Sequence, residues 1–166
     1  MAKLLTTLNV WATTEPERKA KLLADLAELL NRHRYQGEAN GNFAFHDPRI
    51  ALLPTRMSKV DIRSIVQYAG PILIDAGAPE RLRATAAFVL GKTYTVEALN
   101  FIMQAVTEPG LLPAEVARQC AFAYDSLIEV DRSQIPARGS SSIGEHFVRQ
   151  GIPWDAHTGR VDVESL

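Results

Sequence analysis

The residues with the clearest chemical pattern run from Ala86 to Thr93 and end in Gly91-Lys92-Thr93. In a phosphate-binding loop, backbone N–H groups of a glycine-rich turn surround the phosphates, the lysine reaches them, and the threonine hydroxyl binds magnesium. That turn must leave a strand and open a helix. Residues 86–90 are helix-forming or bulky, so we interpret this segment as the end of a helix. A nucleotide-dependent enzyme acting through residues 86–93 is the alternative.

The other side chains capable of catalysis are scattered along the chain. The histidines are His33, His46, His146 and His157. No two of them have the spacing of a zinc-binding helix. Asp47 and Glu145 each adjoin a histidine, but adjacent side chains on a helix point apart. The single cysteine, Cys120, excludes an internal disulfide and a multi-cysteine metal site. We therefore expect no catalytic residue, no metal and no cofactor.

The overall charge argues against nucleic acid as the main partner. The chain has 18 Lys and Arg against 19 Asp and Glu, a formal net charge of −1, whereas nucleic-acid-binding domains are usually basic. Arg32-His33-Arg34-Tyr35 is the one compact basic cluster with an aromatic residue. A basic last turn of a helix explains it as well as phosphate binding does. Nucleic-acid binding through residues 32–34 is the second alternative.

The length and hydropathy indicate an ordinary cytoplasmic protein. The chain has 166 residues, of which 46% are hydrophobic and 22% charged, enough for one compact domain. No apolar run approaches the roughly 20 residues that span a bilayer. The N-terminal segment lacks the apolar length and cleavage site of a signal peptide. We expect no membrane partner.

Two segments of the chain align with one another at a spacing of 34 residues, Pro79–Leu90 and Pro113–Tyr124. They share the proline, a branched apolar residue, small residues and a phenylalanine in the same columns. The segments before them also align, at a spacing of 36. A period of this size is typical of stacked helical hairpins, which cannot bury their apolar faces alone. The pattern predicts helices over 58–69, 79–92, 95–107 and 113–128.

The regions around the repeat have different character. A leucine-rich helix is predicted over 15–34, capped by Thr14, with one apolar stripe. Residues 36–57 are rich in glycine, asparagine and proline and predict a long irregular segment. We expect a single helical domain over 1–135. Residues 136–166 form a C-terminal tail with a short helix, which we expect to dock on that domain through Trp154.

The segment Arg83-Ala84-Thr85-Ala86-Ala87-Phe88-Val89-Leu90-Gly91 resembles the HEAT-repeat family and its short bacterial relatives. In that family a proline-started helix carries an Arg-x-x-Ala-Ala-x-x-Leu-Gly core. The resemblance covers residues 58–128, and the second copy replaces Leu90-Gly91 with Tyr124-Asp125. It implies an all-α fold of about six helices. That fold is a short HEAT-like helical hairpin array, with a compact helical bundle as the other possibility.

The resemblance also implies that the second helix of each unit lines a binding face. Seven residues would then bind a partner from the helices at 58–69 and 95–107. They are Arg63, Gln67, Tyr68, Leu99, Asn100, Met103 and Gln104. The alternative is that Leu99 and Met103 pack inside the protein. We expect a non-catalytic protein-binding module with an adaptor, chaperone-like or toxin-neutralising (immunity) role, of unknown partner and possibly self-associating.

Overall fold

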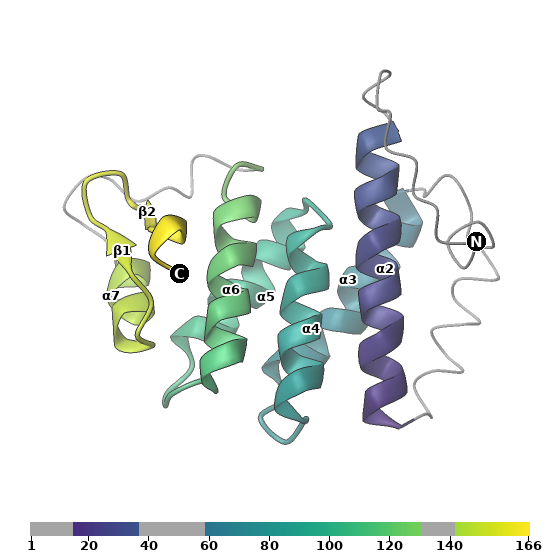
Figure 1. The fold of residues 1–166 in the computed structure, drawn as a ribbon, viewed down its shortest axis with the longest axis horizontal. Helices are drawn as coiled ribbons and strands as arrows, with labels where there is room; N and C mark the ends of the chain where they lie inside the picture. The colour runs from purple at the N-terminus through teal and green to yellow at the C-terminus, as the bar shows by residue number, and fades with distance from the viewer. Residues whose placement is uncertain (1–14, 37–58, 131–141) are drawn as a thin grey trace.

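The computed structural model describes residues 15–36, 59–130 and 142–166 (Figure 1). The described chain is helical apart from one pair of two-residue strands, which confirms the all-α prediction. Its elements, in chain order, are α2 (Pro16–Gln36), α3 (Lys59–Ile74), α4 (Glu80–Gly91), α5 (Val96–Thr107), α6 (Ala114–Leu127), α7 (Ser142–Arg149), β1 (Trp154–Asp155), β2 (Arg160–Val161) and the 3-10 helix η3 (Val163–Ser165). The predicted cap at Thr14 and segment 37–57 lie outside these ranges.

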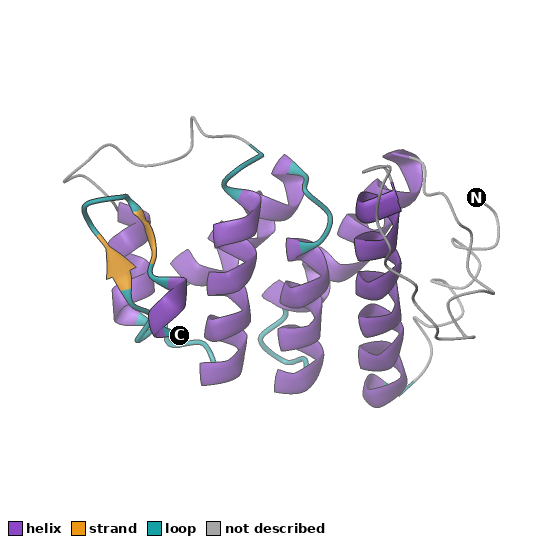
Figure 2. Cartoon of the chain, turned by 45° about the horizontal axis from the view of Figure 1, so that its top comes forward, coloured by secondary structure: helices purple, strands orange, loops and turns teal. Residues whose placement is uncertain are grey.

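The helices form two layers. In Figures 1 and 2, α2, α4 and α6 stand side by side in one layer, and α3 and α5 lie behind them. Helix α4 packs between α2 and α6, and α3 packs on both α4 and α5. Helix α7 packs on α5. This arrangement is common to a hairpin array and a helical bundle, so the HEAT-like resemblance stays a prediction.

Small residues let the helices within each layer approach closely. A Cβ atom on Gly91 would lie 3.0 Å from both Cα and Cβ of Ala123 on α6. A Cβ atom on Gly70 of α3 would lie 2.4 Å from the Phe101 ring on α5. Both distances are shorter than the 3.5–4.0 Å, approximately, of carbon–carbon contact. Each layer therefore contains a glycine at a place where a methyl group does not fit.

Helix α3 is longer than the sequence indicated. The prediction ended it at residue 69, before Gly70-Pro71, but the helix continues through Pro71 to Ile74. Proline removes one backbone hydrogen bond from a helix interior. Leu73, one turn from Gly70, is completely buried, and burying such a side chain is worth about 1.5–3 kcal/mol. Burial beyond the proline thus favours the longer helix.

The C-terminal segment packs on α6 and α7 through aromatic rings and an arginine. The Trp154 ring stacks on Phe147 with centroids 5.8 Å apart, and Tyr124 of α6 meets the same two rings. Strands β1 and β2 pair antiparallel, with Trp154 opposite Val161. The sequence predicted the docked helix and tail but not this strand pair.

Candidate functional site

The seven residues predicted to bind a partner differ widely in exposure. Exposed side chains are Arg63, Gln67, Asn100 and Gln104. Tyr68 and Met103 are half-buried and pack against the core. Leu99 is 0% exposed, because its side of α5 faces the interior rather than solvent. Its assignment to a binding surface is wrong in this arrangement, and the alternative of core packing holds for it.

The exposed part of α3 and α5 is therefore mostly polar. It offers amide and charged groups, with the exposed Val96 and the half-buried Met103 as apolar contributions. The Tyr68 hydroxyl is buried without a hydrogen-bond partner in the described part of the chain. Burial also raises the pKa of Tyr68, so this phenol stays neutral at physiological pH. Among the described residues of α3 and α5, none is an exposed aromatic ring of the kind that dominates many protein interfaces.

Exposed aromatic rings lie on the opposite layer. Phe88 on α4 is 39% exposed and Phe122 on α6 is 36% exposed. They occupy the same column of the duplicated segments, 34 residues apart, and therefore the same level of two neighbouring helices. We call this region, with Lys92, Arg118 and Gln119, the Phe88–Phe122 surface.

A cationic side chain lies over each ring of the Phe88–Phe122 surface. Lys92 Nζ lies 5.2 Å from the centroid of Phe88, and Arg118 Cζ lies 5.4 Å from the centroid of Phe122. Both distances are within the roughly 6 Å over which a cation is attracted to the face of a ring. Arg118 also lies 3.8 Å from Glu115 in an exposed ion pair. The rings are thus ordered by their own neighbours while keeping part of their area in solvent.

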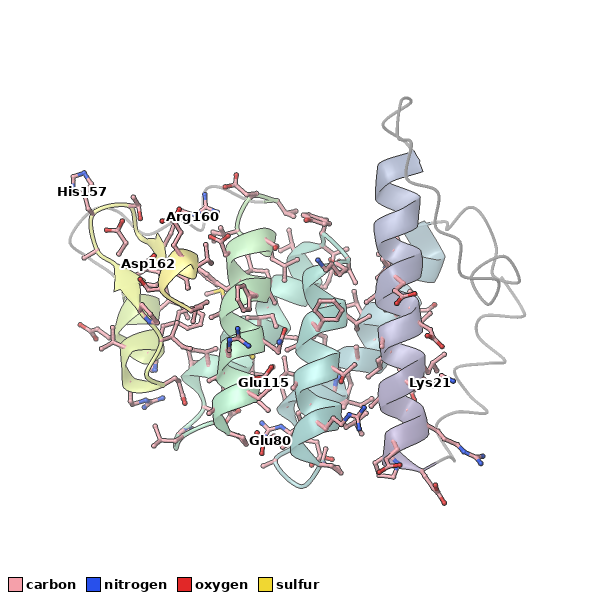
Figure 3. All side chains as sticks on the ribbon, viewed as in Figure 1. Lys21, Glu80, Glu115, His157, Arg160 and Asp162 are labelled. Carbon is pink, nitrogen blue, oxygen red and sulfur yellow. The ribbon has the colours of Figure 1, made fainter. Side chains whose placement is uncertain are left out.

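Two hollows flank the rings. One, of about 550 Å³, lies between α4 and α6 and reaches Val163 and Glu164 of η3. The other, of about 510 Å³, reaches Ala24 of α2. Phe88 and Gln119 line both hollows, so the two are adjacent. Figure 3 shows the α2, α4 and α6 side of the molecule, with Glu80 and Glu115, which line the second hollow, labelled.

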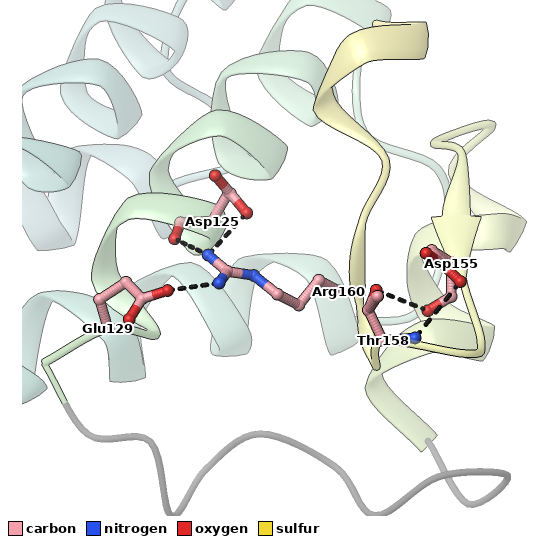
Figure 4. A network of polar contacts seen from close by, with 5 residues as sticks. All are labelled: Asp125, Glu129, Asp155, Thr158 and Arg160. Carbon is pink, nitrogen blue, oxygen red and sulfur yellow. Dashed lines mark hydrogen bonds and ion pairs between the residues drawn. The ribbon is translucent and has the colours of Figure 1, made fainter.

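Arg160 anchors the segment that leads to η3, and η3 forms one wall of the larger hollow. Arg160 Nη2 donates to Asp125 through its backbone oxygen at 3.1 Å and its carboxylate at 3.0 Å. Arg160 Nη1 donates to the Glu129 carboxylate (Figure 4). These carboxylates raise the pKa of Arg160, against the opposing effect of its burial. Arg160 lies three residues before the first residue of η3, so these bonds help to hold Val163 and Glu164 beside α6.

Comparisons with known proteins do not identify a function for this site. No family model, curated protein or solved structure matches this chain. Neither the HEAT-like resemblance nor any activity gains support from a relative.

The phosphate-loop segment is built differently from a nucleotide site. Residues 86–91 lie inside α4, and Gly91 is its last residue rather than the C-cap. The Thr93 hydroxyl donates to the Leu90 carbonyl at 2.8 Å and lies 3.2 Å from the Thr95 hydroxyl. Lys92 lies over Phe88. These groups therefore end one helix and begin the next, where Thr95 caps α5.

The remaining alternatives concern other parts of the chain. Arg32 and Arg34 fall in the last turns of α2, and their side chains are outside the described part of the structure. In the ranges that the structure describes, no three potential metal ligands come together. No helix in those same ranges is long and apolar enough to cross a membrane.

Sequence reasoning missed Phe88 and Phe122 as surface residues. The sequence pattern identified both only as a shared column of the duplicated segments and assigned them no binding role. Helical spacing contains the missing signal. Leu82, Ala86 and Val89 follow one another by four and three residues and are buried, and Phe88 falls off that stripe.

Proposed function

We propose that this protein is a non-catalytic protein-binding module whose partner docks on the Phe88–Phe122 surface. The observation that carries the proposal is the pair of partly exposed rings, at one level of adjacent helices, beside two adjacent hollows. Aromatic and arginine side chains supply a large share of binding energy in protein interfaces, especially where flanking pockets accept residues of the partner.

The shape of the surface favours a helical segment of the partner. The hollows run along α4 and α6 rather than forming one deep cavity. An amphipathic helix laid in this direction would place apolar side chains one or two turns apart into the hollows on either side of Phe88. Its polar residues would meet the charges at the rim, which are of both signs: Arg81, Lys92, Glu80, Glu115 and Glu164.

Within this proposal, the biological role is that of an adaptor, a chaperone-like protein or a toxin-neutralising immunity protein, acting in the cytoplasm. The polar face of α3 and α5, with Gln67 and Gln104, is a secondary contact for a large partner. A second copy of the chain is the other candidate occupant, and size-exclusion chromatography with light scattering distinguishes it.

Aspartate substitutions test the proposal, because both rings are partly in solvent. Phe88→Asp and Phe122→Asp should leave the helical circular dichroism unchanged. Together they should weaken the co-purified partner's affinity by at least about a hundredfold, since interface aromatic residues often contribute 2 kcal/mol or more each. Val148→Asp is the matched control, because Val148 is 59% exposed on α7, away from this surface.

The Val148→Asp control shows whether a loss of affinity is specific to the Phe88–Phe122 surface. Retained affinity in the Val148→Asp variant, with loss in the phenylalanine variants, supports the Phe88–Phe122 surface. Unchanged affinity in the double phenylalanine variant would reject it.

A further inference from the structure

A buried arginine opens onto a second, smaller cavity at the end of the helices. Arg83 of α4 is only 7% exposed. Its Nε donates to the Leu73 carbonyl at 2.9 Å, near the C-terminal end of α3. The side chain also lines a cavity of about 150 Å³ between the α3–α4 turn and the α5–α6 turn. This cavity is separate from the Phe88–Phe122 surface.

The terminal nitrogens of the Arg83 guanidinium donate to no group in the described part of the chain. Among the residues that the structure describes, Leu73 is its only hydrogen-bond partner, and no carboxylate lies within ion-pair distance. Because its terminal nitrogens remain in contact with solvent, they carry an unpaired charge that an incoming anion can reach. The fold does not demand an arginine here either, because the same column of the second copy is Ala117, which is also buried.

The walls of the cavity are fixed by the C-terminal helix and the residue after it. Gln150 donates from Nε2 to the Gly110 carbonyl at 3.2 Å and accepts at Oε1 from the Leu112 N–H at 2.8 Å. Arg149 donates to the Glu108 carbonyl at 3.1 Å. These bonds hold the 108–112 segment in place beside Arg83. The cavity is therefore a formed site.

We infer that this cavity binds a carboxylate attached to a small apolar group. A guanidinium pairs with a carboxylate through two parallel hydrogen bonds, and Arg83 still has its two terminal nitrogens for such a pair. Ile74, Ala105 and Leu112 provide an apolar wall. The volume equals that of roughly five water molecules at about 30 Å³ each. It therefore suits a carboxylate with a short branched chain, either a free acid or the C-terminal residue of a peptide.

Glu108 is the residue that opposes this ligand. It lines the same cavity and is exposed, so its carboxylate can turn away into solvent or compete for Arg83. Glu108→Gln removes that competition and should tighten carboxylate binding severalfold. The variant changes no buried residue, so the fold should be unaffected.

The test uses isobutyrate and the neutral isobutyramide, together with acetyl-Ala-Ala-Val as free acid and as amide. Binding is followed by NMR through the Arg83 Nε–H signal and the amides of Gly77 and Gly110. Saturable shifts with either acid, and none with the amides, are expected. Binding of isobutyrate indicates a free acid as the source, and binding of the peptide acid alone indicates a peptide C-terminus.

A matched pair of variants checks the place of binding without altering Arg83. Ala76 is exposed and lines the cavity. Ala76→Glu brings an internal carboxylate to Arg83 and should weaken acid binding by roughly tenfold or more, as expected for a charged hydrogen-bonded pair. Ala76→Gln has the same size and should retain most of the binding. Equal shifts from acids and amides, no saturation, or equal affinities of the two Ala76 variants would overturn the inference.

Discussion

Replacing Gly91 with alanine should force α4 and α6 apart. The new methyl carbon would lie 3.0 Å from Cα and Cβ of Ala123, at least about 0.5 Å inside the normal carbon–carbon contact distance. Overpacking of this kind costs about 1–3 kcal/mol. The higher helix propensity of alanine offsets up to about 1 kcal/mol of this cost. We therefore expect the free energy of unfolding to fall by up to about 2 kcal/mol.

Urea unfolding of a double-mutant cycle measures the effect. In the Ala123→Gly background one of the two close contacts disappears, so Gly91→Ala should cost about 1 kcal/mol less than in the wild-type background. Gly77→Ala is the control, because Gly77 lies in an exposed turn where the nearest group is the Asp75 carboxylate at 3.3 Å. Its effect should stay within about 0.5 kcal/mol.

Two results would refute this reasoning. If Gly91→Ala stabilises the protein by about 1 kcal/mol, propensity alone governs the site and the close packing is absent. If its cost is the same with alanine and with glycine at position 123, the contact with α6 is not its cause. The experiment contains no nucleotide, so it isolates the packing role of Gly91 from any phosphate-binding role.

Three further predictions concern other parts of the fold. Burial raises the pKa of the Cys120 thiol from 9.0 to about 12, so the unfolded state loses its proton first. Stability is thus complete below pH 9 and falls by up to about 4 kcal/mol as the pH rises to 12; Cys120→Ala should flatten that part of the pH–stability curve, and parallel curves would contradict the burial argument. Arg160→Gln should change global stability by less than about 1 kcal/mol, since ion pairs that keep part of their area in solvent contribute little, yet speed hydrogen exchange in residues 154–166, whereas Arg118→Gln should not. Magnesium with ATP or GTP should leave the melting temperature unchanged; a rise that Lys92→Ala abolishes would establish the nucleotide alternative.

The order of the helices was predictable from the sequence because their signals are local. Proline starts, apolar stripes and the duplicated segments indicated α4, α5 and α6 to within one residue at either end. Those signals act within single helices or between neighbours in the chain. The end of α3 depends instead on tertiary burial of Leu73, which no local pattern reports. The β1–β2 pair depends on docking against α6.

The site was less predictable because exposure depends on which face of a helix its neighbours cover. Leu99 and Phe88 are both large apolar residues within the repeated helices, yet one is fully buried and the other is 39% exposed. Composition does not separate them, and only the angular position on the helix does. Arg83 posed a similar problem, since its isolation from carboxylates follows from the placement of two turns far apart in sequence.

Photo-crosslinking from defined positions tests the proposed binding surface most directly. Benzoylphenylalanine is introduced singly at Phe122, at Gln104 on the α3–α5 face and at Val148 on α7, in cells that produce the protein. The crosslinked product is then identified by mass spectrometry. The Phe88–Phe122 surface predicts one dominant protein adduct from position 122, with little or none from 148. Equal adducts from all three positions, or a dominant adduct from 104 alone, would contradict it.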